Sequence, residues 1–96
     1  MLKADGKTYK GPVAGGGKIS SPIRQISTTS PWKEPNGPGI TCGRNAKNAA
    51  LVAPVTAGST IELAWEDHPG ANWQHNMGPL IDYMAKVRLT LGILKL

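Results

Sequence analysis

Residues 72–91, NWQHNMGPLIDYMAKVRLTL, carry the strongest structural signal in this sequence. From residue 81 onward apolar and polar side chains alternate. The apolar set is Ile81, Tyr83, Ala85, Val87, Leu89 and Leu91, and the polar set is Asp82, Lys86, Arg88 and Thr90, with Met84 as an exception. Successive side chains of a β-strand point to opposite faces, so this alternation predicts a strand with one buried face.

Three further segments are predicted to form strands. In TIELAW, residues 60–65, apolar and polar side chains again alternate. The turn residues Thr-Ala-Gly-Ser at 56–59 separate this segment from 51–55, so the pair predicts a hairpin. Residues 40–42 predict a third, short strand that ends at Gly43.

The composition predicts one small, loop-rich β domain. The chain has 96 residues, with twelve glycines and eight prolines that are spread out and not periodic. Such residues interrupt short extended segments, and the length suits a single domain with a small core. Cys42 is the only cysteine, so no disulfide can form within the sequence. The predicted fold class is therefore all-β with long loops.

The charge does not indicate a nucleic-acid partner. The net charge is +5, and residues 1–50 hold eight Lys and Arg against two acids, whereas residues 51–96 hold three against four. The basic residues are scattered among Gly, Ser and Pro without interleaved aromatics, which argues against a nucleic-acid site. No apolar run approaches the length of a membrane span, and the first ten residues lack the apolar core of a signal peptide.

The two histidines are the candidate metal ligands. His68 and His75 are seven residues apart in the loop that leads into the strand predicted from residue 81. Imidazole is a common ligand of zinc and copper, and loop ends on a β scaffold often hold ligand-binding groups. No HxH, HxxxH or CxxC pattern accompanies them. From spacing alone, they fit either a metal site or partly exposed loop histidines.

Other catalytic arrangements find less support. There is no GxSxG elbow for a serine nucleophile. Four carboxylates could in principle supply a glycosidase pair: Glu62, Glu66, Asp67 and Asp82. Glu66 and Asp67 are adjacent and would diverge, while Glu62 and Asp82 lie on polar strand faces. All four are interpreted as solvated surface groups.

Several segments together resemble a known family. They are ITCGRNA at 40–46, VAPVTAGSTIELAW at 52–65 and WQHNMGPLIDYMAK at 73–86, with DGKTYKGP at 5–12 and SPIRQI at 21–26 as weaker pieces. In order and spacing they are similar to the fungal lytic polysaccharide monooxygenases of auxiliary activity family nine, formerly glycoside hydrolase family sixty-one. The His-x-x-Gly-Pro motif beginning at His75 is the most specific piece.

The resemblance implies a fold and a chemistry. The fold would be part of an immunoglobulin- or fibronectin-like β-sandwich. One copper ion would be held by the mature N-terminal histidine, through its amine and its side chain, and by His75. Members of the family oxidise β-1,4-glucan chains such as cellulose at C1 or C4, draw electrons from an external donor and are secreted. Nitrogen ligands suit Cu(II), in agreement with this expectation.

The sequence also departs from the family pattern. Residue 1 is Met, no His stands near it, and the family's axial Tyr would lie beyond residue 96. The resemblance implies a C-terminal partner for Cys42, and none is present. Residues 1–86 are therefore interpreted as a partial catalytic domain and 87–96 as a tail unlike the family. We therefore expect the chain to be a fragment of the family's catalytic domain that is truncated at both ends, is weakly active or inactive, and has no signal peptide.

An alternative interpretation keeps the scaffold without the chemistry. The chain would then be a non-catalytic β-sandwich module that binds polysaccharide or a protein partner. Trp32 and Trp73 could stack on sugar rings in either case, although large aromatic side chains are also commonly part-buried against loops. The chain is expected to be a monomer.

Overall fold

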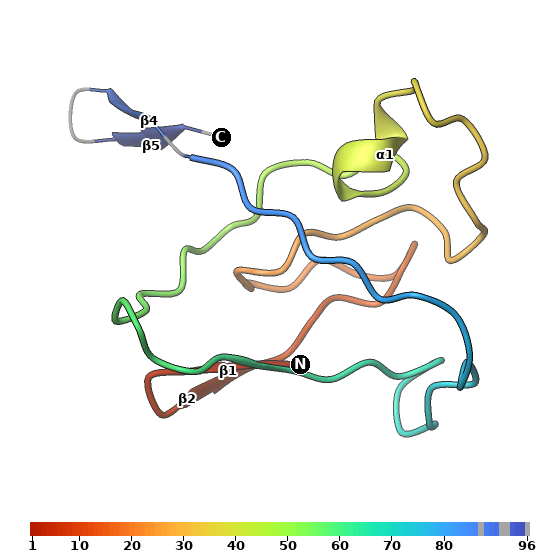
Figure 1. Cartoon of the computed structure of the whole chain (residues 1–96), viewed down its shortest axis with the longest axis horizontal. Helices are drawn as coiled ribbons and strands as arrows, with labels where there is room; N and C mark the ends of the chain where they lie inside the picture. Colours follow the sequence, from red (N-terminus) through yellow and green to blue (C-terminus); the bar gives the residue numbers. More distant parts are fainter. Residues whose placement is uncertain (87, 91–92, 96) are drawn as a thin grey trace.

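The computed structural model describes residues 1–86, 88–90 and 93–95 (Figure 1). Within them, strands β1 (Leu2–Ala4), β2 (Lys7–Tyr9) and β3 (Glu62–Leu63) form an antiparallel sheet in the order β2-β1-β3. Strands β4 (Arg88–Thr90) and β5 (Ile93–Lys95) form a two-stranded antiparallel sheet. The helix α1 (Gly39–Cys42) has only four residues. The predicted all-β class is confirmed, and the other residues that the structure describes lie in turns and loops.

The hairpin β1–β2 was not predicted from the sequence. Its loop is Asp5-Gly6, and both residues have positive φ, 46° and 77°. A two-residue loop of this kind matches the right-handed twist of the paired strands, and Asp-Gly is among its preferred sequences. Leu2 pairs with Tyr9, and Ala4 with Lys7. The Asp-Gly pair was therefore a usable signal that the sequence analysis overlooked.

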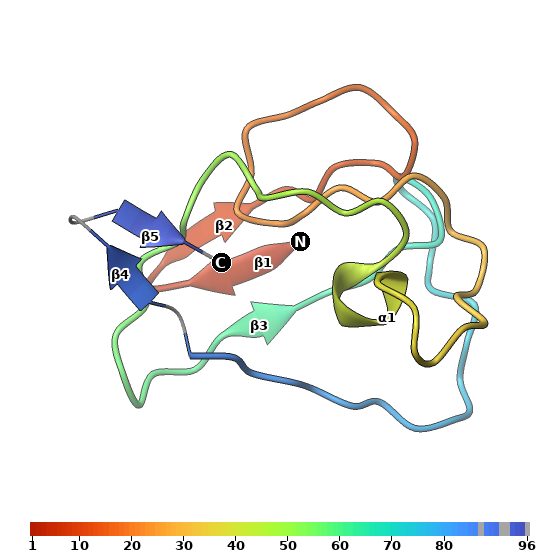
Figure 2. The same cartoon turned by 90° about the horizontal axis from the view of Figure 1, so that it is seen from above.

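The predicted hairpin between residues 51–55 and 60–65 is wrong, although its turn is confirmed. The Ser59 N–H donates to the Thr56 carbonyl at 3.1 Å. Beyond the turn, β3 pairs with β1, so that Leu63 faces Leu2 (Figure 2). The Met1 ammonium group also donates to the Ala64 carbonyl at 3.0 Å and extends this contact.

The Asp5 carboxylate explains why the chain takes this route. It accepts hydrogen bonds from the N–H and the hydroxyl of Thr56 at 2.9 and 3.0 Å, and from the Ser59 hydroxyl at 3.4 Å. These bonds join the 56–59 turn to the β1–β2 loop. The chain that leaves the turn therefore runs beside β1 instead of folding back on residues 51–55.

The long strand predicted from residue 81 is wrong over its first half. Residues 81–86 form no strand, and the side chains of Ile81 and Tyr83 are 63% and 89% exposed. β4 begins only at Arg88, and Val87 and Leu91 lie outside the described residues. A strand needs the backbone of a neighbour to complete its hydrogen bonds, and no described strand pairs with 81–86.

The best-packed part of the described chain is the segment around Ser21. This side chain is 2% exposed, donates to the Lys10 carbonyl at 2.6 Å and accepts from the Ile23 N–H at 3.0 Å. The Gln25 amide donates to the carbonyls of Val13 and Gly16 at 2.8 and 2.9 Å. A buried hydroxyl is tolerated because both of its hydrogen-bonding roles are filled.

Helix α1 replaces the strand predicted at residues 40–42. The predicted stop at Gly43 is confirmed: its N–H donates to the Gly39 carbonyl at 2.8 Å, and its φ and ψ are 99° and 168°. Glycine alone adopts such a backbone readily. The preceding residue, Cys42, is a free and exposed thiol.

Few apolar side chains are buried in the described residues. Ala4 is the buried apolar residue, at 1% exposure, whereas large apolar side chains of residues 51–84 stay open to solvent. Contiguous exposed apolar surface commonly marks a contact region. Among the residues that the structure describes, no helix is long and apolar enough to cross a membrane.

Candidate metal and substrate loop

Residues 66–75 form a closed loop that begins after Trp65 and ends at His75. An isolated antiparallel bridge joins Glu66 to Asn72 and closes it. Inside the loop, the Ala71 N–H donates to the His68 carbonyl at 2.9 Å, and the Gly70 N–H donates to a Glu66 carboxylate oxygen at 3.4 Å. Gly70 has a φ of 81°, which glycine adopts without the strain of a side chain. These local bonds hold the loop together, and His75 is its last residue.

Asp67 is the acidic group of this loop whose pKa lies below its ordinary value. Its carboxylate lies 3.1 Å from Nδ1 of His68. The hydrogen bond with the Gln74 side chain is the largest cause of a lowered pKa for Asp67, and the bond with His68 follows. The charges of His68 and His75 act in the same direction, because positive charge nearby favours an ionised carboxylate. The sequence analysis had treated Asp67 as a surface group and had assigned no role to Gln74.

The Asp67–Gln74 contact gives a pH prediction. The pKa of Asp67, followed by carboxyl NMR, should lie below the ordinary value for aspartate and move toward it in Gln74→Ala. A lowered pKa in the folded state adds stability above the unfolded-state pKa, and this contribution is lost as the pH falls through the folded-state pKa. Gln25→Ala, on another loop, should leave the pKa of Asp67 unchanged. An equal shift in both variants would rule out the contact.

His75 and Trp73 lie side by side at the end of the loop. Their ring centroids are 5.1 Å apart, and the ring planes are tilted by 56°. The His75 ring is exposed, and Trp73 is 50% exposed. The structure therefore brings together two of the residues that the sequence proposed for the site. The site therefore combines an imidazole, which can supply a nitrogen ligand, with a neighbouring half-exposed indole ring.

Trp32 lies elsewhere, in the loop that leads to α1. Its side chain is half-buried, and its Nε1 donates a hydrogen bond to the Glu34 carbonyl. The ring packs so closely on the backbone that a Cβ placed on Gly39 would lie 2.5 Å from one ring atom. The Arg44 guanidinium stands 5.2 Å from the ring centroid, in cation–π range. Much of this indole is therefore already in contact with its own loop.

The metal ligands do not gather into a cluster in the described part of the chain. No group of three or more His, Cys, Asp or Glu side chains placed to hold a metal ion occurs there. His68 and His75 belong to the same loop, but Nδ1 of His68 is engaged with Asp67. His75 is thus the more available of the two imidazoles for a metal ion.

Comparison with known proteins places this loop in a family context. The family model of Auxiliary Activity family 9 (formerly GH61) matches residues 1–92. The match runs past residue 86, where the sequence analysis had placed the end of the family segment. No solved structure gives a significant match.

Individual relatives agree with this match. The chain is 44% identical over 81 residues to AA9 family lytic polysaccharide monooxygenase D of Gloeophyllum trabeum, which covers 84% of this chain and 24% of that protein. It is 36% identical over 88 residues to lytic polysaccharide monooxygenase F of Malbranchea cinnamomea, covering 88% of this chain and 35% of the relative. The chain thus spans about a quarter to a third of the length of these relatives.

Proposed function

Since the chain belongs to Auxiliary Activity family 9, we propose that it provides the His75 part of a copper site for the oxidative cleavage of β-1,4-glucan. One observation carries the proposal: the histidine of the His-x-x-Gly-Pro motif has an exposed ring at the end of a hydrogen-bonded loop. A ligand in this position can reach a metal ion and an insoluble chain from the same side. As proposed, the polymer is cellulose or a related β-glucan.

The fit of a copper ion to these residues is partial. Imidazole nitrogen is a suitable ligand for Cu(II), and His75 supplies one such donor. The described residues contain no cluster of three ligands, so the remaining donors of a three-nitrogen site are not among them. A bound copper ion would supply the redox chemistry for oxidising a C–H bond of the glucan. His75 would bind it, and Asp67 would help to hold the loop through Gln74 and His68.

Substrate contact is proposed for the aromatic side chains. Trp73 stands beside His75 and keeps half of its surface open, so it can stack on a sugar ring next to the ligand. Trp32 was proposed for the same role. Because its ring is packed on Gly39 and paired with Arg44, we expect a smaller contribution from it. In the same proposal the electron donor is external, and the protein is secreted and monomeric. The division into a catalytic-domain part (1–86) and a tail (87–96) stays a prediction from the sequence, and the family match extends six residues into that tail.

Copper titration tests the proposal. Isothermal calorimetry of the 96-residue chain with Cu(II) should give one ion per chain, and electron paramagnetic resonance should show nitrogen coordination. The expected signal is a tetragonal Cu(II) centre, because nitrogen ligands favour that geometry. Weak binding to several sites with only oxygen ligation would contradict the proposed copper role.

A second candidate function is favoured by the half-exposed ring of Trp73. The chain would then be a non-catalytic β module that binds polysaccharide or a protein partner, with Trp73 as a contact residue. Sedimentation of the chain with cellulose, with and without Cu(II), separates the two. Cellulose binding that is the same with and without Cu(II), together with a negative copper titration, would support the non-catalytic module.

A further inference from the structure

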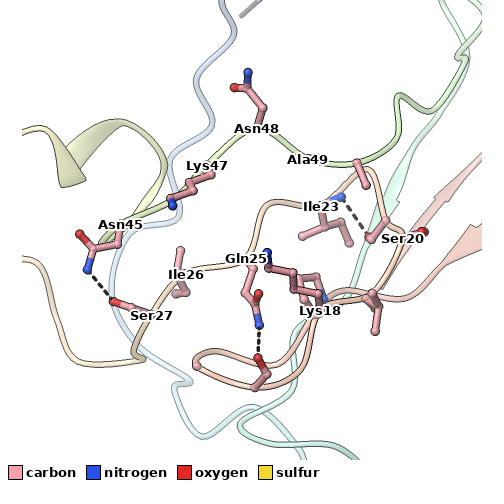
Figure 3. A pocket seen from close by; sticks show the side chains of 16 residues that line it. Lys18, Ser20, Ile23, Gln25, Ile26, Ser27, Asn45, Lys47, Asn48 and Ala49 are labelled. Carbon is pink, nitrogen blue, oxygen red and sulfur yellow. Dashed lines mark hydrogen bonds between the residues drawn. The ribbon is translucent and has the colours of Figure 1, made fainter.

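A hollow of about 600 Å³ lies between the loop 12–27 and the segment 45–50 (Figure 3). Pockets of this size accommodate small organic ligands. None of its lining residues belongs to the His75 loop. The polar and charged residues of its lining include Lys18, Ser20, Gln25, Asn45, Lys47 and Asn48.

The charged side chains that line this hollow are both positive. Lys18 comes from one side and Lys47 from the other, and no Asp or Glu lines it (Figure 3). In the described residues neither ammonium group has a hydrogen-bond or ion-pair partner, and the ion pair found there joins Asp67 to His68. Lys18 and Lys47 are both exposed and line one concave surface without a neighbouring carboxylate, so their combined positive charge favours an anionic ligand.

Some of the other polar side chains of the lining make hydrogen bonds within the protein, whereas others are available to hydrogen-bond a ligand. The Gln25 amide clamps the turn at 13–16, and the Asn45 amide donates to the Ser27 hydroxyl at 3.3 Å. The side chains of Asn48 and Ser20 have no partner among the described hydrogen bonds. An amide and a hydroxyl both donate and accept, which suits the hydroxyl groups of a sugar.

We propose that this hollow binds the carboxylate-bearing ring of an acidic saccharide, a uronate residue within or beside the glucan. The lysines would pair with the carboxylate, and Asn48 and Ser20 would bond the ring hydroxyls. The choice of a saccharide rests on the proposed function, whereas the choice of an anion rests on the lining alone. The site would direct the chain toward glucans that lie against acidic polysaccharide.

The test compares two oligosaccharides of equal length by calorimetry. A β-1,4-linked glucuronate trimer should bind roughly tenfold more tightly than cellotriose, because two surface charge pairs contribute modestly. The affinity for the glucuronate trimer should fall between 50 and 200 mM NaCl, since salt screens exposed pairs. Lys18→Gln combined with Lys47→Gln should remove the preference for the acidic trimer.

The matched control is Lys7→Gln with Lys33→Gln, which removes the same charge outside the lining. This variant should retain the preference for the acidic trimer. Equal loss in both double variants, or equal binding of the two trimers, would overturn the proposal. Inorganic phosphate that displaces the trimer at comparable concentration would also overturn it, because the hollow would then select charge and not sugar. Circular dichroism of each variant checks that the exposed substitutions leave the fold intact.

His75→Ala separates this proposal from the copper proposal. The variant should bind the glucuronate trimer as the parent chain does, because His75 does not line the hollow. Loss of trimer binding in His75→Ala would place the sugar elsewhere and overturn the proposal. A negative copper titration with retained trimer binding would instead refute only the copper role.

Discussion

His75→Ala is expected to lower the affinity of the chain for Cu(II) by roughly 100-fold or more. Removing the partner that orients a metal-binding histidine commonly costs about 10- to 100-fold in affinity, so removing the ligand itself should reach at least the upper end. His75 has an exposed ring for which the described residues show no hydrogen bond to either nitrogen. Calorimetric titration of parent and variant measures the change, and electron paramagnetic resonance should show the loss of one nitrogen ligand.

His68→Ala is the matched control, because it removes the same side chain from the same loop. Nδ1 of His68 lies 3.1 Å from the Asp67 carboxylate, so this ring is expected to position the loop and not to bind the ion. The copper affinity should fall much less in His68→Ala than in His75→Ala. Equal large losses would show a two-histidine site, and an unchanged affinity in His75→Ala would exclude this residue as a ligand.

Gly43→Ala is expected to destabilise the chain by about 2–4 kcal/mol, since backbone strain and overpacking each cost about 1–3 kcal/mol. Gly43 has φ 99° and ψ 168°, a conformation nearly restricted to glycine. A Cβ there would lie 2.4 Å from Cγ2 of Ile26, a methyl group on a branched carbon that cannot easily swing away. The substitution should therefore push α1 away from residues 26–27. In the parent chain the Ser27 N–H donates to the Arg44 carbonyl at 3.0 Å, which links these residues to the segment that follows α1. Urea unfolding followed by tryptophan fluorescence measures the free-energy change.

Gly17→Ala provides the comparison for this prediction. No heavy atom lies within 4 Å of a Cβ placed on Gly17, and its φ is outside the positive range. Alanine should be neutral or slightly stabilising there, because it reduces the freedom of the unfolded chain. A Gly43→Ala variant as stable as Gly17→Ala would show that the contact between Gly43 and Ile26 does not constrain the fold.

Sequence reasoning predicted local features more reliably than pairings. The turn at 56–59 and the stop at Gly43 were predicted, because turn residues and glycine act through their own backbone preferences. The all-β class also followed from composition and alternation. The strand partners did not follow, since pairing between residues as distant in sequence as Leu2 and Leu63 leaves no local pattern.

The site shows the same division. His75 was proposed from a motif, and Trp73 was proposed, with Trp32, as a large aromatic side chain that could stack on sugar rings. Asp67 and Gln74 were missed because they are seven residues apart and meet only when the Glu66–Asn72 bridge closes the loop. The sequence signal for this pair was two polar residues on either side of a Pro-Gly turn. Such an arrangement is common in loops, so it did not single out Asp67 and Gln74.

The sequence by itself determined the family, the fold class and the identity of the candidate ligand, because motifs and alternation are read along the chain. Only the tertiary structure decided that β3 pairs with β1, that Trp73 stands against His75 while Trp32 packs on Gly39, and that Lys18 and Lys47 share one hollow. The physical reason is that each of these contacts depends on how the loops close. The Asp5 carboxylate is an example. It accepts hydrogen bonds from Thr56 and Ser59 and so joins two loops that are distant in sequence, and neither loop's sequence alone predicts these bonds.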